Sequence, residues 1–149
     1  MVTLNDSYDK LSEKNIEDFE CTNKVKLTSN YREFLFKWNG GTPDVAVFKV
    51  PQWKGITVMH YFYGIDDPDN DLEVYLDIYK FRLPEGFIPI GNDGGGNAIL
   101  LGTTGPYYDH IYFWDHENEP DLEGPDMSNM YFLANNIWEF LDSLYEDDE

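Results

Sequence analysis

The chain has 149 residues, of which 42% are hydrophobic and 17% aromatic, enough for one domain with a sizeable core. Its 29 acidic residues outnumber its 10 basic residues, so the formal net charge is −19. That balance argues against binding to nucleic acid or to an anionic membrane, since both need clustered Lys and Arg, and it favours a basic protein partner.

The negative charge is concentrated in the second part of the chain. Arg82 is the last basic residue, and residues 83–149 contain 15 of the acidic residues and therefore −15 of the net charge. A surface of that kind steers cationic proteins into contact. Solubility alone explains the composition equally well, so both interpretations stay open.

Cysteine usage and the ends of the chain bear on its location. The single cysteine, Cys21, excludes an internal disulfide and fits a reducing cytoplasm. The N-terminus has no basic region followed by an apolar run, and no apolar segment approaches the roughly 20 residues needed to cross a bilayer. We therefore expect a soluble, cytoplasmic protein.

Two helices are predicted near the start of the chain. Residues 8–19 have weakly periodic apolar positions, whereas residues 28–41 have a clear apolar stripe with the spacing i, i+3, i+4 and i+7. The stripe consists of Tyr31, Phe34, Leu35 and Trp38.

The ends of the second helix also carry signals. The candidate N-caps are Thr28, Ser29 and Asn30. Asn30 and Glu33 have the spacing of a capping box, and Gly40 and Gly41 favour a left-handed helix end. This segment is therefore predicted to be helical with a sharp stop.

A β-hairpin and a further helix are predicted next. Residues 44–50 and 58–63 are rich in Val, Phe and Tyr, with a loop over 51–55 whose Pro and Trp favour an exposed edge position. Residues 72–81 have helical periodicity, capped by a preceding Asn or Asp and ended by Pro84.

The central stretch, residues 83–117, has the pattern of an antiparallel meander. Its three apolar runs are strand-length and separated by turn residues, at 87–90, 98–101 and 110–114. The first corner holds the triplet Gly94, Gly95 and Gly96. Trp114 ends the last strand, and an acidic segment follows it.

The chain ends in an acidic loop over 118–129, a predicted helix over 131–145 and a four-acid tail over 146–149 that we expect to fray, because acids oppose the dipole at a helix C-terminus. The expected fold is a single α+β domain spanning residues 1–149. It has a mainly antiparallel central sheet and about four helices packed largely on one face.

Two segments look like ligand loops but lack the full patterns. The glycine run over 92–97 is followed by a strand and has no nearby Lys, unlike a phosphate-binding loop, so a tight turn is the better interpretation. The acidic run over 66–71 would need Gly and Glu where Leu72 and Ile78 stand, so a helix-capping turn is favoured over a calcium site.

Catalytic chemistry has little support in the sequence. The three histidines lack the spacing of a metal site, and no cofactor or metal is expected. His116 lies between Asp115 and Glu117, which leaves a general acid/base role conceivable beside the simpler interpretation of an exposed histidine. Cys21 has no nucleophile signature around it.

A group of aromatic residues precedes the acidic segment. Its members are Tyr107, Tyr108, Tyr112, Phe113 and Trp114. Strand alternation places Tyr112 and Trp114 on one face and Ile111 and Phe113 on the other. One face must be core, and the other, if exposed, would form an acid-rimmed aromatic surface suited to protein recognition.

Taken in order, these pieces resemble the SUKH superfamily, which includes the yeast Smi/Knr-type cell-wall assembly regulators and many bacterial toxin-immunity proteins. The matching segments are residues 16–20, 27–41, 83–101 and 111–117. Thr28 departs from the family, which often has Pro there, and residues 42–82 match least clearly.

The resemblance implies an α+β fold, no catalytic activity and a protein partner. Bacterial members bind a cognate toxin in the cytoplasm, and such toxins are often nucleases or deaminases with basic substrate surfaces. This agrees with the acidic composition. The leading hypothesis is a toxin-neutralising binding module; a regulatory scaffold of the cell-wall assembly type and an enzyme using His116 are the alternatives.

Contact with the partner is expected from the acids after Trp114, which are Asp115, Glu117, Glu119, Asp121 and Glu123. The motif glycines and one tryptophan are expected to serve the fold instead, at Gly40, Gly41, Gly94, Gly95, Gly96 and Trp114. The identity of the toxin and the oligomeric state are left open.

Overall fold

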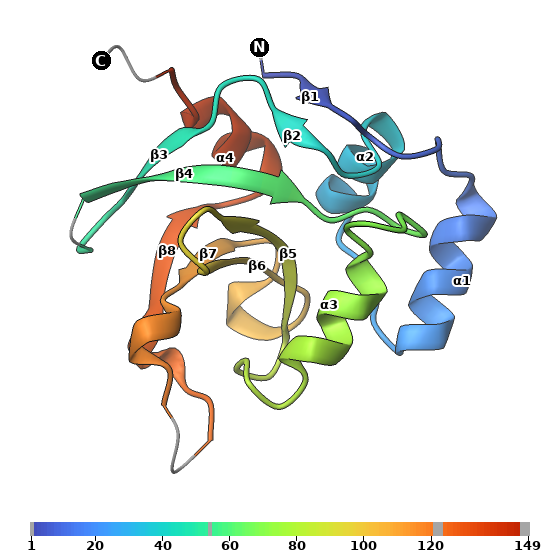
Figure 1. Ribbon diagram of the computed structural model, residues 1–149. Helices are drawn as coiled ribbons and strands as arrows, with labels where there is room; N and C mark the ends of the chain where they lie inside the picture. Colours follow the sequence, from blue (N-terminus) through green and yellow to red (C-terminus); the bar gives the residue numbers. More distant parts are fainter. Residues whose placement is uncertain (1, 54, 121–123, 147–149) are drawn as a thin grey trace.

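A six-stranded antiparallel sheet in the order β3-β4-β5-β6-β7-β8 forms the centre of the molecule (Figure 1). The computed structural model describes residues 2–53, 55–120 and 124–146. The strands of this sheet are β3 (Val47–Val50), β4 (Gly55–Phe62), β5 (Phe87–Asp93), β6 (Ala98–Gly102), β7 (Ile111–Trp114) and β8 (Met130–Ala134). A two-stranded sheet of β1 (Leu4–Asn5) and β2 (Thr42–Pro43) lies beside it.

The described residues also form four α-helices and three short 3-10 helices. The α-helices are α1 (Glu13–Asn23), α2 (Ser29–Lys37), α3 (Leu72–Tyr79) and α4 (Ile137–Ser143). The 3-10 helices are η1 (Gly105–Tyr107), η2 (His116–Asn118) and η3 (Met127–Asn129). The predicted α+β architecture is confirmed.

Neighbouring strands of the sheet are consecutive in sequence, as the predicted meander requires. The pairing of β4 with β5 shifts register between Met59 and Tyr61, and that of β5 with β6 shifts between Pro89 and Gly91. Such bulges increase the twist of a sheet. The hairpin of β3 and β4 lies at the edge, as its loop composition predicts.

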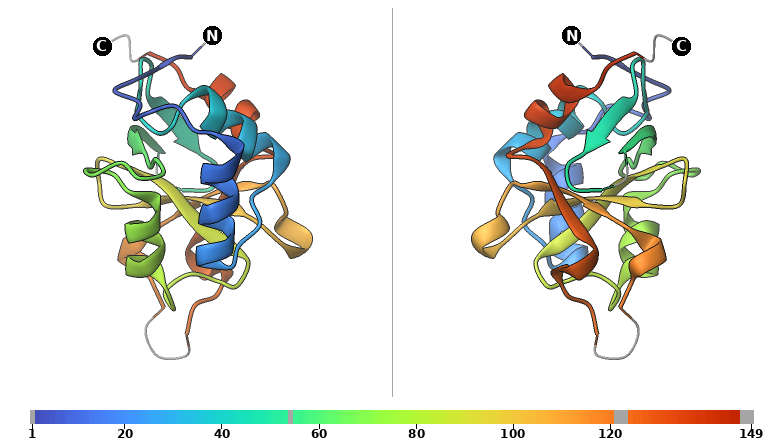
Figure 2. Two further views of the ribbon diagram at one scale, coloured as in Figure 1. Left: turned by 90° about the vertical axis from the view of Figure 1, so that its right-hand side faces the viewer. Right: turned by 90° about the vertical axis from the view of Figure 1, so that its left-hand side faces the viewer.

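The helices α1, α2 and α4 share one large apolar core with the sheet. Ile16 of α1, Phe34 of α2 and Phe140 of α4 are at most 1% exposed. Helix α2 lies near both α1 and α4, and α3 lies beside the end of α1, where Nδ2 of Asn23 donates to the carboxylate of Glu73 at 2.9 Å (Figures 1 and 2). Dispersion and burial in this aromatic-rich core are the main source of stability.

The N-terminal caps of the first two helices differ in part from those predicted. Helix α1 begins only at Glu13, because Ser12 and Asn15 form a reciprocal capping box. Thr28 caps α2 by accepting the backbone N–H of Tyr31 at 3.3 Å. The capping box predicted for Asn30 does not form, since its side-chain amide donates to Asp109 at 2.7 Å.

The glycine pair after α2 serves close packing rather than the helix end. Trp38 is the C-cap, in an extended conformation. Gly40 has φ +75, and a Cβ there would lie 2.8 Å from the backbone nitrogen of Gly64. Gly41 has φ +126 and its N–H donates to the carbonyl of Phe62. The left-handed helix end predicted for this pair does not form, and both glycines instead allow close approach of backbone segments.

The predicted helix over 131–145 is wrong in its first part. Met130–Ala134 is the strand β8, paired with β7, and α4 begins only at Ile137. The aromatic and branched residues of this segment suit a strand, and Asn136 starts a new helix by accepting the backbone N–H of Glu139. The acidic tail beyond residue 146 lies outside the described residues.

Candidate functional site

The glycine corner between β5 and β6 is built around a buried carboxylate. Asp93 is 3% exposed. One of its oxygens accepts the backbone N–H groups of Gly95 and Asn97 at 2.9 and 2.8 Å, and the other accepts the hydroxyl of Thr57 at 2.8 Å. The backbone N–H groups of Gly95 and Asn97 therefore donate to a carboxylate of the chain itself and are not free to bind a phosphate. The interpretation of this segment as a tight turn holds.

Only the last glycine of the triplet needs to be glycine. Gly96 has φ +89, and a Cβ there would lie 3.2 Å from Nε2 of His116. Gly94 and Gly95 do not adopt positive φ. The side-chain oxygen of Asn97 accepts the backbone N–H of His116 at 3.0 Å, so the corner holds the start of η2 in place.

Asp115 is buried and its carboxylate is used inside the fold. It is 2% exposed and accepts hydrogen bonds from Nε1 of Trp53 at 3.2 Å, Nδ2 of Asn118 at 2.6 Å and the backbone N–H of Glu117 at 3.1 Å. Burial is the largest single influence and raises the pKa of Asp115, but these hydrogen bonds together outweigh it and lower the pKa. Asp115 therefore stays ionised, and its carboxylate links Trp53 to the residues of η2.

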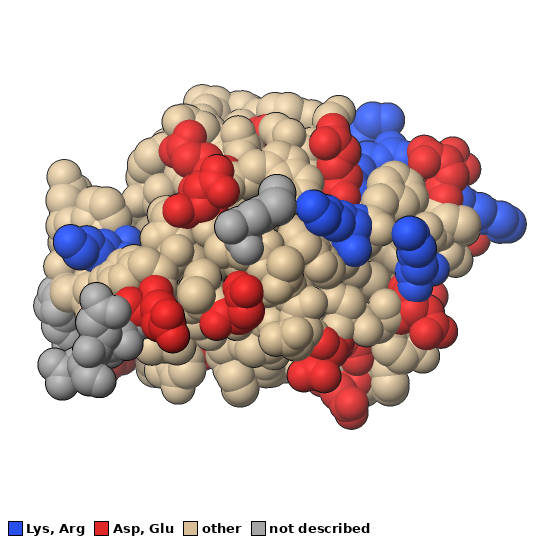
Figure 3. Space-filling view, turned by 90° about the horizontal axis from the view of Figure 1, so that it is seen from above, with Lys and Arg blue, Asp and Glu red and all other residues tan. Residues whose placement is uncertain are grey.

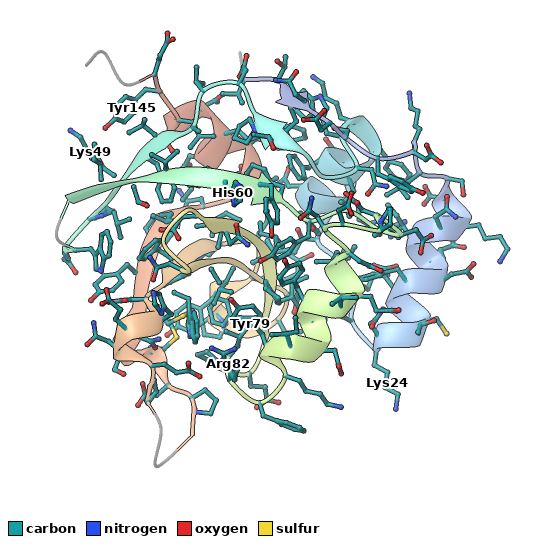
Figure 4. The ribbon with its side chains drawn as sticks, viewed as in Figure 1. Lys24, Lys49, His60, Tyr79, Arg82 and Tyr145 are labelled. Carbon is teal, nitrogen blue, oxygen red and sulfur yellow. The ribbon has the colours of Figure 1, made fainter. Side chains whose placement is uncertain are left out.

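Arg82, the last basic residue, is also used inside the fold. Its guanidinium forms two hydrogen bonds of 3.0 Å with the carboxylate of Glu119. The same group lies 4.8 Å from the ring centre of Tyr79 and 5.2 Å from that of Trp114. Figure 4 shows Arg82 beside Tyr79, below the sheet. This stack ties the end of α3 to the acidic segment after β7.

The five predicted contact acids therefore lie in different environments. Asp115 is buried, Glu117 is exposed, and Glu119 is half-buried in its pair with Arg82. Asp121 and Glu123 lie outside the described residues. A role of these acids in binding stays a prediction, and Glu117 is the one of the three described acids whose carboxylate faces solvent.

The two faces of β7 differ as strand alternation predicts. Ile111 and Phe113 belong to the main core, whereas Trp114 lies in a second, smaller apolar cluster with Tyr112 at its border. Trp114 is only 1% exposed, so it supports the fold. Phe132 of β8, whose ring meets that of Tyr112 edge-on, is 40% exposed, and Tyr108, which precedes β7, is 52% exposed.

His116 is exposed and borders an open hollow of about 510 Å³ that Arg82 and Glu119 also line. The flanking Asp115 is committed to its three donors and Glu119 to Arg82. Among the described residues, no three His, Cys, Asp or Glu side chains gather as metal ligands would. The run over 66–71 is a capping turn: Asp71 caps α3, and Asp67 accepts the N–H groups of Asp69 and Asn70.

The sequence interpretation missed one exposed residue near this site. The helical periodicity over 72–81 predicts that Phe81 belongs to the helix, but α3 ends at Tyr79 and Phe81 has φ +70. It is 84% exposed and lines the hollow beside His116. The nearby Pro84 marks the helix end only approximately, and no local pattern shows that an aromatic ring is turned outward.

Two comparisons place this chain among known proteins. Residues 10–143 match the model of the SMI1 / KNR4 family (SUKH-1). The chain is also similar to the SPbeta prophage-derived uncharacterized protein YokK of Bacillus subtilis (strain 168), with 30% identity over 89% of this chain and 73% of that protein. None of the helices in the described ranges has the length and apolar character needed to span a membrane.

Proposed function

Because the chain belongs to the SMI1 / KNR4 family (SUKH-1), we propose that it is a non-enzymatic immunity protein. It binds a cognate toxin of the nuclease or deaminase type in the cytoplasm and blocks the basic surface with which the toxin holds its substrate. The single observation that carries this proposal is the distribution of charge along the chain and over the fold.

In the second half of the chain the exposed charges are acidic. Arg82 is paired with Glu119, and no Lys or Arg follows it. The exposed acids of the described part of this half are Glu85, Glu117, Asp126, Glu139, Asp142 and Glu146. Seen from above, most of the visible Lys and Arg side chains gather on the side of α1 and α2, whereas acids spread across the view (Figure 3).

Such a surface competes directly with a nucleic-acid substrate for a basic cleft. Complementary charges raise the association rate and orient the partner, and salt screens both effects. A toxin whose cleft is covered by a folded acidic domain is sterically closed to its substrate. The inhibitor therefore needs no catalytic group of its own.

The test uses the purified catalytic domain of a nuclease- or deaminase-type toxin chosen from the genes that neighbour this chain's gene. We expect the two proteins to form a complex, the toxin's activity to be inhibited, and cells expressing both to grow. Raising NaCl from about 0.05 M to about 0.5 M should weaken binding by about tenfold or more. Absence of binding contradicts the proposal and favours the regulatory-scaffold alternative; binding that is indifferent to salt contradicts its electrostatic basis.

A further inference from the structure

Helix α3 exposes apolar side chains on its outer surface. Leu72 of this helix is fully buried in the main core. Val74 and Ile78, one helical turn apart, point outward and are 52% and 50% exposed. Phe81 follows just beyond the helix end and is 84% exposed. A contiguous exposed apolar ridge of this kind is typical of a surface that meets a partner.

Phe81 is unfavourable in the free protein in two respects. Its φ of +70 lies in the left-handed region, which bulky side chains rarely adopt. Its ring gains little from packing because it stands in solvent, with Nζ of Lys80 5.3 Å from the ring centre. A strained backbone at a residue whose side chain packs against nothing in the free chain is characteristic of functional positions.

Two hollows of the surface meet at Phe81. A groove of about 860 Å³ lies between the end of α1, helix α3 and the segment over 83–89. The hollow beside His116 and Glu119 lies next to it, and Phe81 lines both. The apolar ridge is therefore continuous with the acidic segment after β7, although the two are distant in sequence.

The charges around the groove indicate what fits it. Glu73, Asp77 and Glu85 line it against two lysines, Lys24 and Lys80. A second copy of this chain is a poor occupant, because each copy carries a net charge of −19. A segment with apolar side chains flanked by Lys and Arg complements both the ridge and the acids.

We infer that the α3 groove is the docking site for a basic amphipathic segment of the protein partner, with Phe81 as its central apolar anchor. The inference rests on the proposed function, since it takes the partner to be the basic toxin. Apolar anchors in the middle of an interface dominate binding free energy, and acids at the border add orientation. The contact surface thus extends well beyond the acids after Trp114.

The first experiment measures the affinity of variants for the toxin domain by calorimetry. We expect Phe81→Gly and Ile78→Ala to raise Kd by about tenfold or more each. Glycine suits the backbone at position 81, so the melting temperature of Phe81→Gly should not fall. Val58→Ala is the matched control, since Val58 is 51% exposed on β4, outside the groove, and should leave Kd unchanged.

The second experiment separates this inference from the proposed function. A synthetic helix with a leucine stripe flanked by lysines is titrated into the labelled protein, and NMR shifts are mapped. Shifts at Val74, Ile78 and Phe81 that vanish when serine replaces the leucines support the groove even if no toxin binds. The inference is overturned by shifts elsewhere, by tight toxin binding to Phe81→Gly, or by a dimer in sedimentation that this variant abolishes.

Discussion

Asp115 illustrates how a residue of the acidic segment serves the fold rather than its surface. Asp115→Asn puts an amide donor either opposite both Nε1 of Trp53 and Nδ2 of Asn118 or opposite the backbone N–H of Glu117, and all three are donors. We expect the variant to be less stable by about 1–3 kcal/mol at pH 7. Urea denaturation measures this, and Glu117→Gln, whose carboxylate is exposed, is the control.

The same residue predicts a pH dependence. The folded state lowers the pKa of Asp115, so its contribution to stability is complete above the unfolded pKa of about 3.9 and is lost as the pH falls through the folded value. Stability curves measured from pH 7 down to pH 3 should therefore fall less steeply for Asp115→Asn than for the natural chain. Parallel curves would show that Asp115 does not titrate as its contacts indicate.

The glycine triplet allows a comparison within three residues. Gly96→Ala forces a Cβ into a left-handed backbone and against His116, and we expect a loss of about 1 kcal/mol. Gly94→Ala meets no atom within 4 Å and should change stability little. Thermal unfolding measures the stability of the two variants. Equal losses of stability would contradict the conclusion that only Gly96 of the triplet needs to be glycine.

At the scale of elements, α4 depends on its cap. Asn136→Ala removes the side-chain acceptor of the Glu139 backbone N–H, so we expect a loss of about 1 kcal/mol in unfolding free energy. Asp142→Ala, exposed on the same helix, should stay within about 0.5 kcal/mol of the natural chain. A cap variant as stable as this control would show that packing of α4 on α2 makes the cap dispensable.

Local pattern predicted most elements, because the meander and α2 have periodic apolar residues bounded by turn residues. The prediction failed where the same residues fit both a helical and a strand periodicity. Leu133 continues the apolar stripe of α4 at the spacing i, i+4 to Ile137, but it also fits the alternation of β8. Local pattern also could not reveal Asp93 as an anchor, since Thr57 donates from another strand 36 residues away. Contacts of this kind depend on strand register, which local sequence does not determine.

For the whole molecule, salt should act in opposite directions on the free protein and its complex. A net charge of −19 destabilises the compact state through self-repulsion, and screening relieves it. We expect the melting temperature of the free chain to rise between about 0.05 M and about 0.5 M NaCl while toxin binding weakens. A falling melting temperature would indicate that pairs such as Arg82 with Glu119 outweigh the repulsion.

The pairing of Val47 with Tyr145 has a consequence for biosynthesis. Each donates its backbone N–H to the other's carbonyl at 3.0 Å, so the first residue of the edge strand β3 is paired with a residue made almost a hundred positions later. The ribosome must release the chain through residue 145 before this edge closes and α4 reaches α2. A nascent or prematurely terminated chain therefore exposes an open strand edge and part of its core, and we expect quality-control proteases to remove it.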